Sequence, residues 1–305
     1  MKKILLIAPS FYEYRKEIKN SLIQKGFIVD DYDERPKNSF LMKVVVRLNL
    51  RFLFYNAYKK YYENILRQLK NKAYTYSIFI NIEALDETYI TKIKQLQPES
   101  KFILYMWDSI QNKPNYLNKI KLFDKVFSFD RLDCLKHKEI QFLPLFYSGN
   151  FYDSPDRLKF SYDICFIGSA HSGRVNVFQK LLKNLDGEKC FIYLYFSSWL
   201  FLMITMLRGM SVNIIRRASL SYLSLENVSA HMKVAKVIVD LPHPRQSGMT
   251  MRVIEAVGMN KKIITTNRDV TNYDFYDPEM IFVLDENKML LPSADFINSP
   301  GRFNC

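Results

Sequence analysis

The residues best suited to chemistry lie in one stretch, residues 240–267, which reads DLPHPRQSGMTMRVIEAVGMNKKIITTN. An apolar run ends at Asp240, a proline-containing loop follows, and a helical pattern begins near Thr250. The first turn of a helix has N–H groups without intrahelical partners and the positive end of the helix dipole. Gly248 would let a phosphate approach this backbone, and the hydroxyls of Ser247 and Thr250 would be further donors. We interpret the stretch as a diphosphate-binding site.

Glu255 lies further along the same predicted helix, where a carboxylate can accept both hydroxyls of a ribose. The helix is expected to end near Gly258. His243 and Gln246 in the preceding loop, and Asn267 after the next strand, are further candidates for contact with a nucleotide. The alternative is an ordinary core helix that begins at a glycine and whose glutamate is solvated.

A candidate general base lies in the first half of the chain. Asp108 directly follows the apolar run 102–107, which places a carboxylate at the carboxyl end of a predicted strand. There it could take a proton from an acceptor hydroxyl. Glu83, after the run 77–82, is a rival, and the alternative for Asp108 is a cap on the following loop or helix.

Apolar runs alternate with amphipathic helical stretches along most of the chain, which predicts parallel sheets covered on both faces. We expect strands at 3–8, 27–32, 77–82, 102–107, 125–129, 141–143, 162–168, 191–196, 234–240 and 262–266. We expect helices at 12–25, 56–70, 87–96, 174–185 and 250–258. Residues 144–159, which contain two prolines, two serines and Gly149, interrupt the alternation. The prediction is an α/β chain of two Rossmann-like, doubly wound lobes, residues 1–147 and 148–305, with a ligand-binding cleft between them.

The stretch 240–267 also resembles the donor-binding signature of GT-B glycosyltransferases, R-x-x-E-A-x-x-x-x-K-x-I/V-I-x-T. The matching positions are Arg252, Glu255, Ala256, Lys261, Ile263, Ile264 and Thr266. The chain further resembles bacterial capsule and lipopolysaccharide biosynthesis proteins with the spore-maturation type of glycosyltransferase domain. That resemblance rests on DERPKNSF (33–40), YMWDS (105–109), YDICFIGSAHSGR (162–174), DLPHPRQSGMTMRVIEA (240–256) and KKIITTN (261–267).

The resemblance implies roles at a second loop, 168–174. It implies that the backbone of Gly168 faces the nucleotide and that Arg174 neutralises the phosphate of the leaving group, with His171 a weaker candidate. The alternative is a tight turn with an exposed arginine. The resemblance also implies metal-independent catalysis, so we expect the D-x-D pair Asp31 and Asp33 to hold no metal.

Two features depart from the family pattern. Ser247 stands where many retaining enzymes have a second glutamate, which leaves the stereochemical course open. After Val283 the chain has only a short tail interrupted by proline, so the helix that usually crosses back to the first lobe is expected to be reduced or absent.

The net charge of +13 favours anionic partners, namely nucleotide phosphates, an anionic membrane or nucleic acid. Within residues 35–72 there are ten basic residues and one acidic residue, and Lys43, Arg47 and Arg51 recur along one side of a predicted helix. A basic face beside apolar and aromatic residues suits an anionic bilayer surface. The alternatives are a solvated basic face and RNA binding, but no recognised nucleic-acid-binding motif supports RNA, and we expect no nucleic-acid partner.

Residues 190–207 contain 18 uncharged residues, which is close to the length of a membrane span. The alternative, which we favour, is a buried strand, a turn at Ser197 and Ser198, and a helix packed on the sheet. The four cysteines form no CxxC pair, and the N-terminus lacks the pattern of a signal peptide, so we expect a cytoplasmic protein.

Together these observations predict a glycosyltransferase that moves a sugar from a nucleotide diphosphate sugar to a cell-surface polysaccharide or lipid-linked glycan. No cofactor is expected, because the nucleotide sugar is a co-substrate. Peripheral contact with the inner face of the plasma membrane is expected from charge and resemblance. The alternative is a non-catalytic GT-B-like scaffold that binds a nucleotide or glycan.

Overall fold

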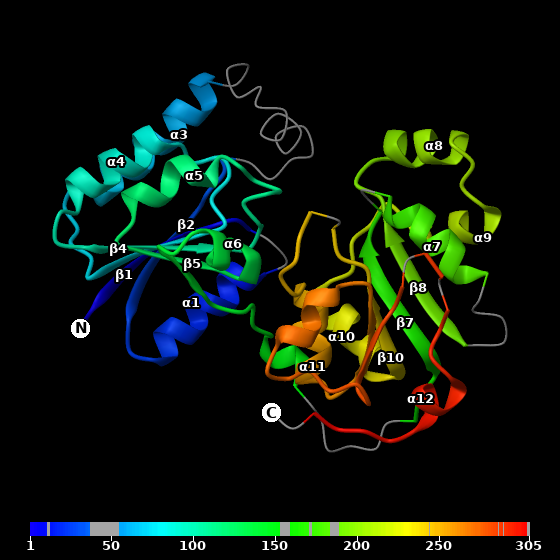
Figure 1. The fold of residues 1–305 in the computed structure, drawn as a ribbon. Coiled ribbons are helices and arrows are strands. Elements are labelled where there is room, and N and C mark those ends of the chain that lie inside the picture. The colour runs from blue at the N-terminus through cyan, green and yellow to red at the C-terminus, as the bar shows by residue number, and fades with distance from the viewer. Residues whose placement is uncertain are drawn as a thin grey trace. The chain divides into compact units, whose positions relative to one another are not determined.

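The computed structural model describes residues 1–10, 13–36, 55–152, 159–170, 173–183, 189–243, 245–285, 287–288 and 290–303. The chain forms two compact units, residues 1–144 and 145–305, each built on its own sheet (Figure 1). The division falls at Pro144 and Leu145, close to the expected boundary at 147 and 148.

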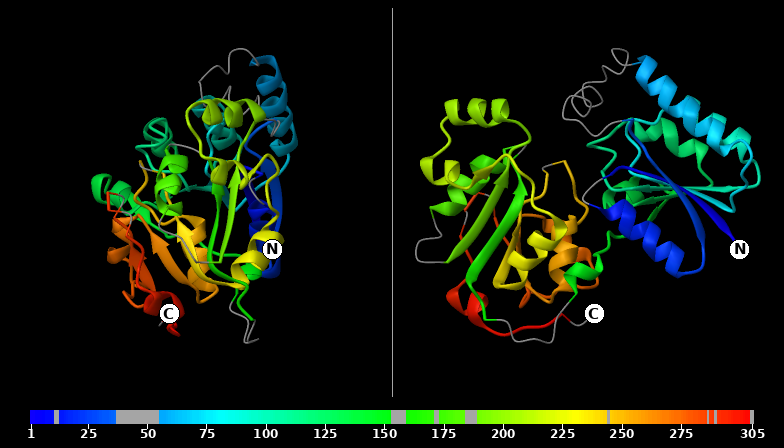
Figure 2. Two further views of the ribbon diagram at one scale, coloured as in Figure 1. Left: turned by 90° about the vertical axis from the view of Figure 1, so that its right-hand side faces the viewer. Right: turned by 180° about the vertical axis from the view of Figure 1, so that it is seen from behind.

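The first unit is a six-stranded parallel sheet with the order β2-β1-β3-β4-β5-β6. Its strands are β1 (Lys3–Ala8), β2 (Ile28–Asp33), β3 (Tyr76–Ile80), β4 (Lys101–Met106), β5 (Lys125–Ser128) and β6 (Ile140–Phe142). Its helices are α1 (Tyr14–Gln24), α3 (Tyr55–Leu69), α4 (Glu87–Leu96), α5 (Tyr116–Lys119), the 3-10 turn η2 (Ile120–Leu122) and α6 (Arg131–Lys136). Helices α3 and α4 cover one face of the sheet and α1 lies on the other (Figures 1 and 2).

The second unit is also a six-stranded parallel sheet, with the order β12-β11-β10-β7-β8-β9. Its strands are β7 (Tyr162–Ser169), β8 (Cys190–Tyr195), β9 (Ala218–Ser219), β10 (Ala235–Asp240), β11 (Lys262–Thr265) and β12 (Ile281–Val283). Its helices are α7 (Arg174–Leu182), α8 (Trp199–Leu207), α9 (Val212–Ile215), α10 (Leu225–Lys233), α11 (Met251–Gly258) and α12 (Ala294–Asn298), with the 3-10 turns η3 (Gly149–Phe151) and η4 (Arg268–Asn272). The second strand order is that of the dinucleotide-binding Rossmann fold. The prediction of two Rossmann-like lobes is therefore confirmed.

Central strands of both sheets are mostly apolar and buried because helices cover both faces. In β1 every residue after Lys3 is buried, and in β11 all four residues are buried. Such continuous apolar runs are why the sequence identified most strands to within two residues.

The uncharged run 190–207 folds as β8 followed by α8, which confirms the interpretation as a strand, a turn and a helix. Ser198 caps α8 by accepting a hydrogen bond from the backbone N–H of Phe201 at 3.2 Å. Within the part of the chain that the structure describes, no helix has the length and hydrophobicity that crossing a bilayer requires.

The C-terminal tail packs on the second unit. Lys262 at the start of β11 donates through Nζ to the backbone carbonyl of Phe296 (2.6 Å) and to the hydroxyl of Ser299 (2.7 Å). The backbone N–H of Phe303 donates to Asn260 Oδ1 at 2.8 Å. The tail thus stabilises the edge of the second sheet that carries β11.

Residues 147–151, just after the boundary between the two units, pack closely against Gly258 of α11. A Cβ atom on Gly258 would lie 2.7 Å from the backbone oxygen of Phe151 and 2.7 Å from Cγ of Tyr147. We expect Gly258→Ala to lower the free energy of unfolding by about 1–2 kcal/mol, because overpacking outweighs the gain in helix propensity. Urea unfolding followed by circular dichroism measures the change.

Gly149 provides the matched control, because no heavy atom lies within 4 Å of the position its Cβ would take. Gly149→Ala should leave stability within about 0.5 kcal/mol of the original protein. A Gly258→Ala protein at least as stable as the original would contradict the packing described here.

Candidate functional site

In the second unit the strand order reverses between β7 and β10. These two strands are adjacent and parallel, but β8 lies on the far side of β7 and β11 on the far side of β10. Ligands of doubly wound sheets bind at the carboxyl ends of the strands at such a switch point. Gly168 lies next to the end of β7, and Asp240 is the last residue of β10. The candidate residues of the loops 168–174 and 240–250 follow these two strands, so both loops begin at the switch point.

Arg174, the first residue of α7, folds back over the end of β7. Its Nη1 donates to the backbone oxygen of Ser169 at 2.8 Å. A Cβ on Gly168 would lie 3.1 Å from that same Nη1 and 2.9 Å from the ring of Phe166, so glycine leaves room for the guanidinium. Burial lowers the pKa of Arg174, and the charge of Asp240 opposes that shift.

Asp240 is buried, and its two carboxylate oxygens accept hydrogen bonds from two hydroxyls. Thr250 Oγ1 donates to Oδ1 at 2.7 Å, and Thr265 Oγ1 donates to Oδ2 at 3.1 Å. Burial raises the pKa of Asp240, whereas the two hydroxyls and the charges of Arg174 and Arg252 lower it. The carboxylate thus joins the ends of β10 and β11 to the start of α11.

Thr250 is the N-cap of α11, and its hydroxyl oxygen accepts from the backbone N–H of Val253. Because its single proton goes to Asp240, the hydroxyl is already engaged as both donor and acceptor. The structure thus shows Thr250 capping and anchoring α11, whereas the sequence suggested a direct donor to phosphate.

The loop before α11 is held by Asn267 and Tyr273. Asn267 is buried, and its Nδ2 donates to the backbone oxygens of Ser247 (2.8 Å) and Gly248 (3.4 Å). The hydroxyl of Tyr273 accepts from the backbone N–H of Met249 at 3.3 Å. Asn267 therefore fixes the backbone of the loop at Ser247 and Gly248. Its position after a predicted strand did not reveal this role.

The other two loop residues contact the loop itself. Gln246 Nε2 donates to the backbone oxygen of Gly248 at 3.4 Å. His243 Nδ1 accepts from the backbone N–H of Arg245 at 3.2 Å. Both side chains are partly exposed.

Arg252 and Glu255 form an ion pair within α11. Arg252 Nη1 lies 2.7 Å from Glu255 Oε2, and the side chain of Glu255 is only 2% exposed. Both residues match the expected donor-binding signature, and the structure brings them together one turn apart.

Two guanidinium groups of this unit lie within electrostatic range of each other. The charge of Arg252 contributes to lowering the pKa of Arg174, so the two groups are close enough to repel. The Nε atoms of both are buried, and among the described residues neither has a hydrogen-bond partner. Buried donors without partners are costly, so this arrangement favours an anionic ligand.

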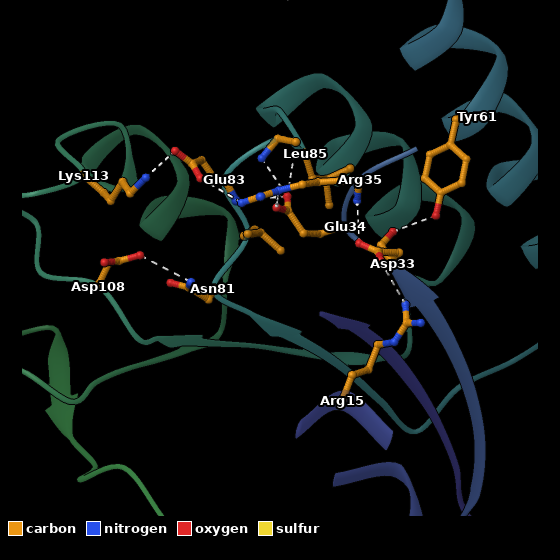
Figure 3. A network of polar contacts seen from close by, with 12 residues as sticks. Arg15, Asp33, Glu34, Arg35, Tyr61, Asn81, Glu83, Leu85, Asp108 and Lys113 are labelled. Atoms are coloured by element: carbon orange, nitrogen blue, oxygen red, sulfur yellow. Dashed lines mark hydrogen bonds and ion pairs between the residues drawn. The ribbon is translucent and has the colours of Figure 1, made fainter. Parts of the chain in front are cut away.

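The first unit holds a second cluster of charges, at the carboxyl ends of β2, β3 and β4 (Figure 3). Glu34 follows β2 and is fully buried. Its Oε2 accepts from three consecutive backbone N–H groups, those of Glu83 (3.0 Å), Ala84 (2.6 Å) and Leu85 (3.4 Å). Burial raises the pKa of Glu34, and the adjacent guanidinium of Arg35 and the backbone N–H of Ala84 oppose the shift.

Arg35 and Lys113 both pair with the carboxylate of Glu83. Arg35 Nη2 lies 2.8 Å from Glu83 Oε2, and Lys113 Nζ contacts Glu83 Oε1. Arg35 Nε also contacts Glu34 Oε1. Glu34, Arg35, Glu83 and Lys113 thus form a chain of alternating charges that fixes the loop after β3.

Asp108 lies beside this chain, after β4. Its oxygens accept from Asn112 Nδ2 (3.1 Å) and Asn81 Nδ2 (3.4 Å). Asn81 is oriented by the hydroxyl of Tyr116, which donates to its Oδ1 at 2.7 Å. Burial raises the pKa of Asp108, and the nearby charge of Lys113 opposes the shift.

The D-x-D pair is engaged by cations of α1. Asp31 pairs with Lys19 (2.6 Å) and Arg15 (3.5 Å), and Arg15 also lies 3.7 Å from Asp33. Across the described ranges, no group of three or more His, Cys, Asp or Glu side chains is arranged to hold a metal ion.

Some expected residues lie outside the described residues: His171, the basic positions Lys43, Arg47 and Arg51, and Cys305. The charge chain around Glu34 was not expected, although the segment containing Glu34 and Arg35 was one of those that carried the family resemblance. The sequence signal that points to it is a pair of opposite charges directly after a predicted strand.

The comparisons agree with this geometry at the level of the fold. AviGT4, a glycosyltransferase involved in avilamycin A biosynthesis, matches with a TM-score of 0.52 and 10% identity over 88% of this chain and 79% of that one. UGT2 of Phytolacca americana, solved with UDP-2-fluoro-glucose and pterostilbene, matches with a TM-score of 0.51 and 9% identity over 97% and 88%. The fold is GT-B. The sequence itself matches no family model and no curated protein.

A substitution of Glu34 tests how much this residue stabilises the charge chain of the first unit. Glu34→Ala removes the acceptor of three N–H groups and a buried partner of Arg35. We expect it to lower the free energy of unfolding by about 3–5 kcal/mol, the usual effect of breaking a buried ion pair. Urea unfolding measures the loss.

Glu63→Ala is the matched control, because the Glu63–Lys92 pair in the same unit is well exposed, at 40% and 44%. Exposed pairs contribute little, so this variant should unfold like the original protein. Equal effects of the two variants would show that the Glu34 cluster does not hold the loop.

Proposed function

We propose that the chain is a glycosyltransferase that uses a nucleotide diphosphate sugar as donor. The observation that carries the proposal is the buried Nε groups of Arg174, which lies beside Gly168 at the switch point of the second unit, and of Arg252 on α11. Both guanidinium groups retain an unused, buried N–H, and a diphosphate presents oxygens that such donors bind. UGT2, which has this fold, was solved with a UDP sugar.

In this proposal the donor lies along the start of α11. Gly248 and Ser247 contact the diphosphate through the backbone and the hydroxyl, and Arg174 neutralises the charge that develops on the leaving group. Glu255 binds the ribose, and His243 and Gln246 line the loop. Thr250 and Asn267 position α11 and the loop and do not contact the donor. Leaving-group stabilisation by guanidinium groups and backbone N–H groups requires no metal.

Asp108 is the proposed general base. Its raised pKa and its neutral amide partners suit a carboxylate that must accept a proton. Glu83 is a poorer base because two cations, Arg35 and Lys113, hold its charge. The structure thus favours Asp108 over its rival.

The proposed acceptor is a cell-surface polysaccharide or a lipid-linked glycan at the inner face of the plasma membrane. The net charge of +13 supports contact with an anionic membrane. The acceptor follows from the family resemblance of the sequence.

Calorimetric titration with UDP, GDP, ADP and CMP tests the donor site. We expect one nucleotide to bind in the micromolar range. Arg174→Gln should weaken it by about 1.5–3 kcal/mol, the range for hydrogen bonds to charged groups. Arg268→Gln is the control, because Arg268 lies in the same unit but its side chain is 77% exposed.

A 2′-deoxy analogue of the nucleotide that binds tests the role of Glu255. The original protein should prefer the ribose form by about 1–3 kcal/mol, and Glu255→Gln should lose most of that preference. An unchanged preference would remove Glu255 from the ribose site. Absence of binding by every nucleotide would instead favour the non-catalytic scaffold.

The pH dependence of donor turnover tests Asp108. Once the nucleotide is known, release of nucleoside diphosphate from its sugar donors can be measured. Asp108→Asn should lower turnover by about 10²–10⁴-fold and leave nucleotide affinity unchanged.

A base must be deprotonated, so turnover should fall as pH drops through the pKa of Asp108. Because that pKa is raised, the acid limb should lie above 3.8, the ordinary value of the group. The Glu83→Gln variant should show the same acid limb in the pH dependence of turnover as the original protein. Loss of the limb in Glu83→Gln and its survival in Asp108→Asn would exchange the two roles.

A further inference from the structure

Helix α8 presents an apolar surface to solvent. Five of its nine residues are large, apolar and exposed: Trp199 (65%), Leu200 (55%), Met203 (46%), Ile204 (39%) and Leu207 (83%). Their spacing by one, three or four places them along one side of the helix. No residue of α8 is fully buried.

The opposite side of α8 holds the helix on the second unit. Phe201, Leu202 and Met206 pack against the apolar core that contains β7, β8 and α7. The ring of Phe201 lies 5.6 Å from that of Phe196, the residue that follows β8. The inner side is therefore explained by core packing, and the exposed outer side needs another explanation.

The surroundings of the outer side are cationic. Residues 190–225 contain three arginines, Arg208, Arg216 and Arg217, and no acidic residue. Arg208 and Arg216 are exposed, and they follow α8 and α9. Val212, at the start of α9, is 62% exposed and adds to the same apolar surface.

We propose that α8 and α9 form a membrane-docking surface that lies in the plane of an anionic bilayer. The outer residues of α8 insert into the interface, and Arg208 and Arg216 bind lipid phosphates. Exposed apolar helices flanked by arginine, with tryptophan at the edge, suit this position. Figures 1 and 2 show α8 beyond the carboxyl end of β8.

The helix is too short for any other arrangement in a bilayer. Nine residues span about 13 Å, whereas a crossing needs about 20 residues. The charge also favours a lipid partner, because residues 190–225 offer arginines and no acidic residue to an anionic surface.

The inference rests on the proposed function in one respect: a membrane-bound acceptor explains why the protein would lie near a membrane. The surface itself is independent of the nucleotide site, so the two can fail separately. It also differs from the basic stretch 35–72, which belongs to the first unit.

Flotation with vesicles of 3:1 phosphatidylethanolamine to phosphatidylglycerol tests the proposal. We expect the original protein to float, and Leu200→Gln with Leu207→Gln to lower its partition coefficient at least about tenfold. Arg208→Gln and Arg216→Gln should each lower it about fivefold, the effect of one cation at an anionic surface. Pure phosphatidylcholine vesicles should bind the original protein less.

Leu135→Gln is the matched control, because Leu135 is 56% exposed on α6 of the first unit. Trp199 provides a direct reading, since its fluorescence should shift to shorter wavelength on binding. Calorimetry with the nucleotide should give the same affinity for all these variants.

Three results would overturn the proposal. The protein could fail to float while binding its nucleotide normally. It could float equally well with the α8 substitutions, which would move the membrane contact to residues 35–72. Finally, the substitutions could dissociate a dimer in solution without any vesicle binding, which would make α8 a contact between copies.

Discussion

The second unit depends on one buried carboxylate. Asp240 ends the central strand β10, accepts from the residue that caps α11, and accepts from the last residue of β11. The carboxylate also provides the negative charge that offsets burial of Arg174. Without it the cap of α11 would lose its anchor, and buried Arg174 would lose the negative charge that offsets its burial. The position of the glycine loop therefore follows from a residue that need not contact a ligand.

Both units concentrate charge at the carboxyl ends of their parallel strands, but they balance it differently. In the first unit Glu34, Arg35, Glu83 and Lys113 pair in sequence, so each charge has an opposite neighbour. In the second, Glu255 pairs with Arg252, while Arg174 donates to a neutral carbonyl and takes part in no ion pair among the described residues. The first arrangement rigidifies loops, whereas the second leaves positive charge available to an anion.

The fold could be predicted from the sequence because its signals are local. Continuous apolar runs mark the central strands, and Gly258 and Thr250 mark the ends of α11. The short edge strand β9 has two residues and carries no such run, so it was missed. Side-chain roles were harder to predict because they depend on pairing between distant residues. Glu34 accepts from N–H groups about fifty positions away, and the proton of Thr250 goes to a residue ten positions before it.

Composition alone does not decide whether the run 190–207 crosses a membrane or packs on a sheet. Hydropathy sums over all sides of a helix, so it gives the same value for a helix in lipid and for one with two different apolar faces. In α8 one face packs on the core of its own unit, which fixes the helix to the second sheet. The other face remains apolar although no described part of the unit buries it, while the flanking charges are all positive. An apolar face without a covering element is unfavourable in water. This apolar face lies beside arginines and no acidic residue. At an anionic interface the apolar face can insert among lipids while the arginines bind phosphates and the other face stays packed on the core.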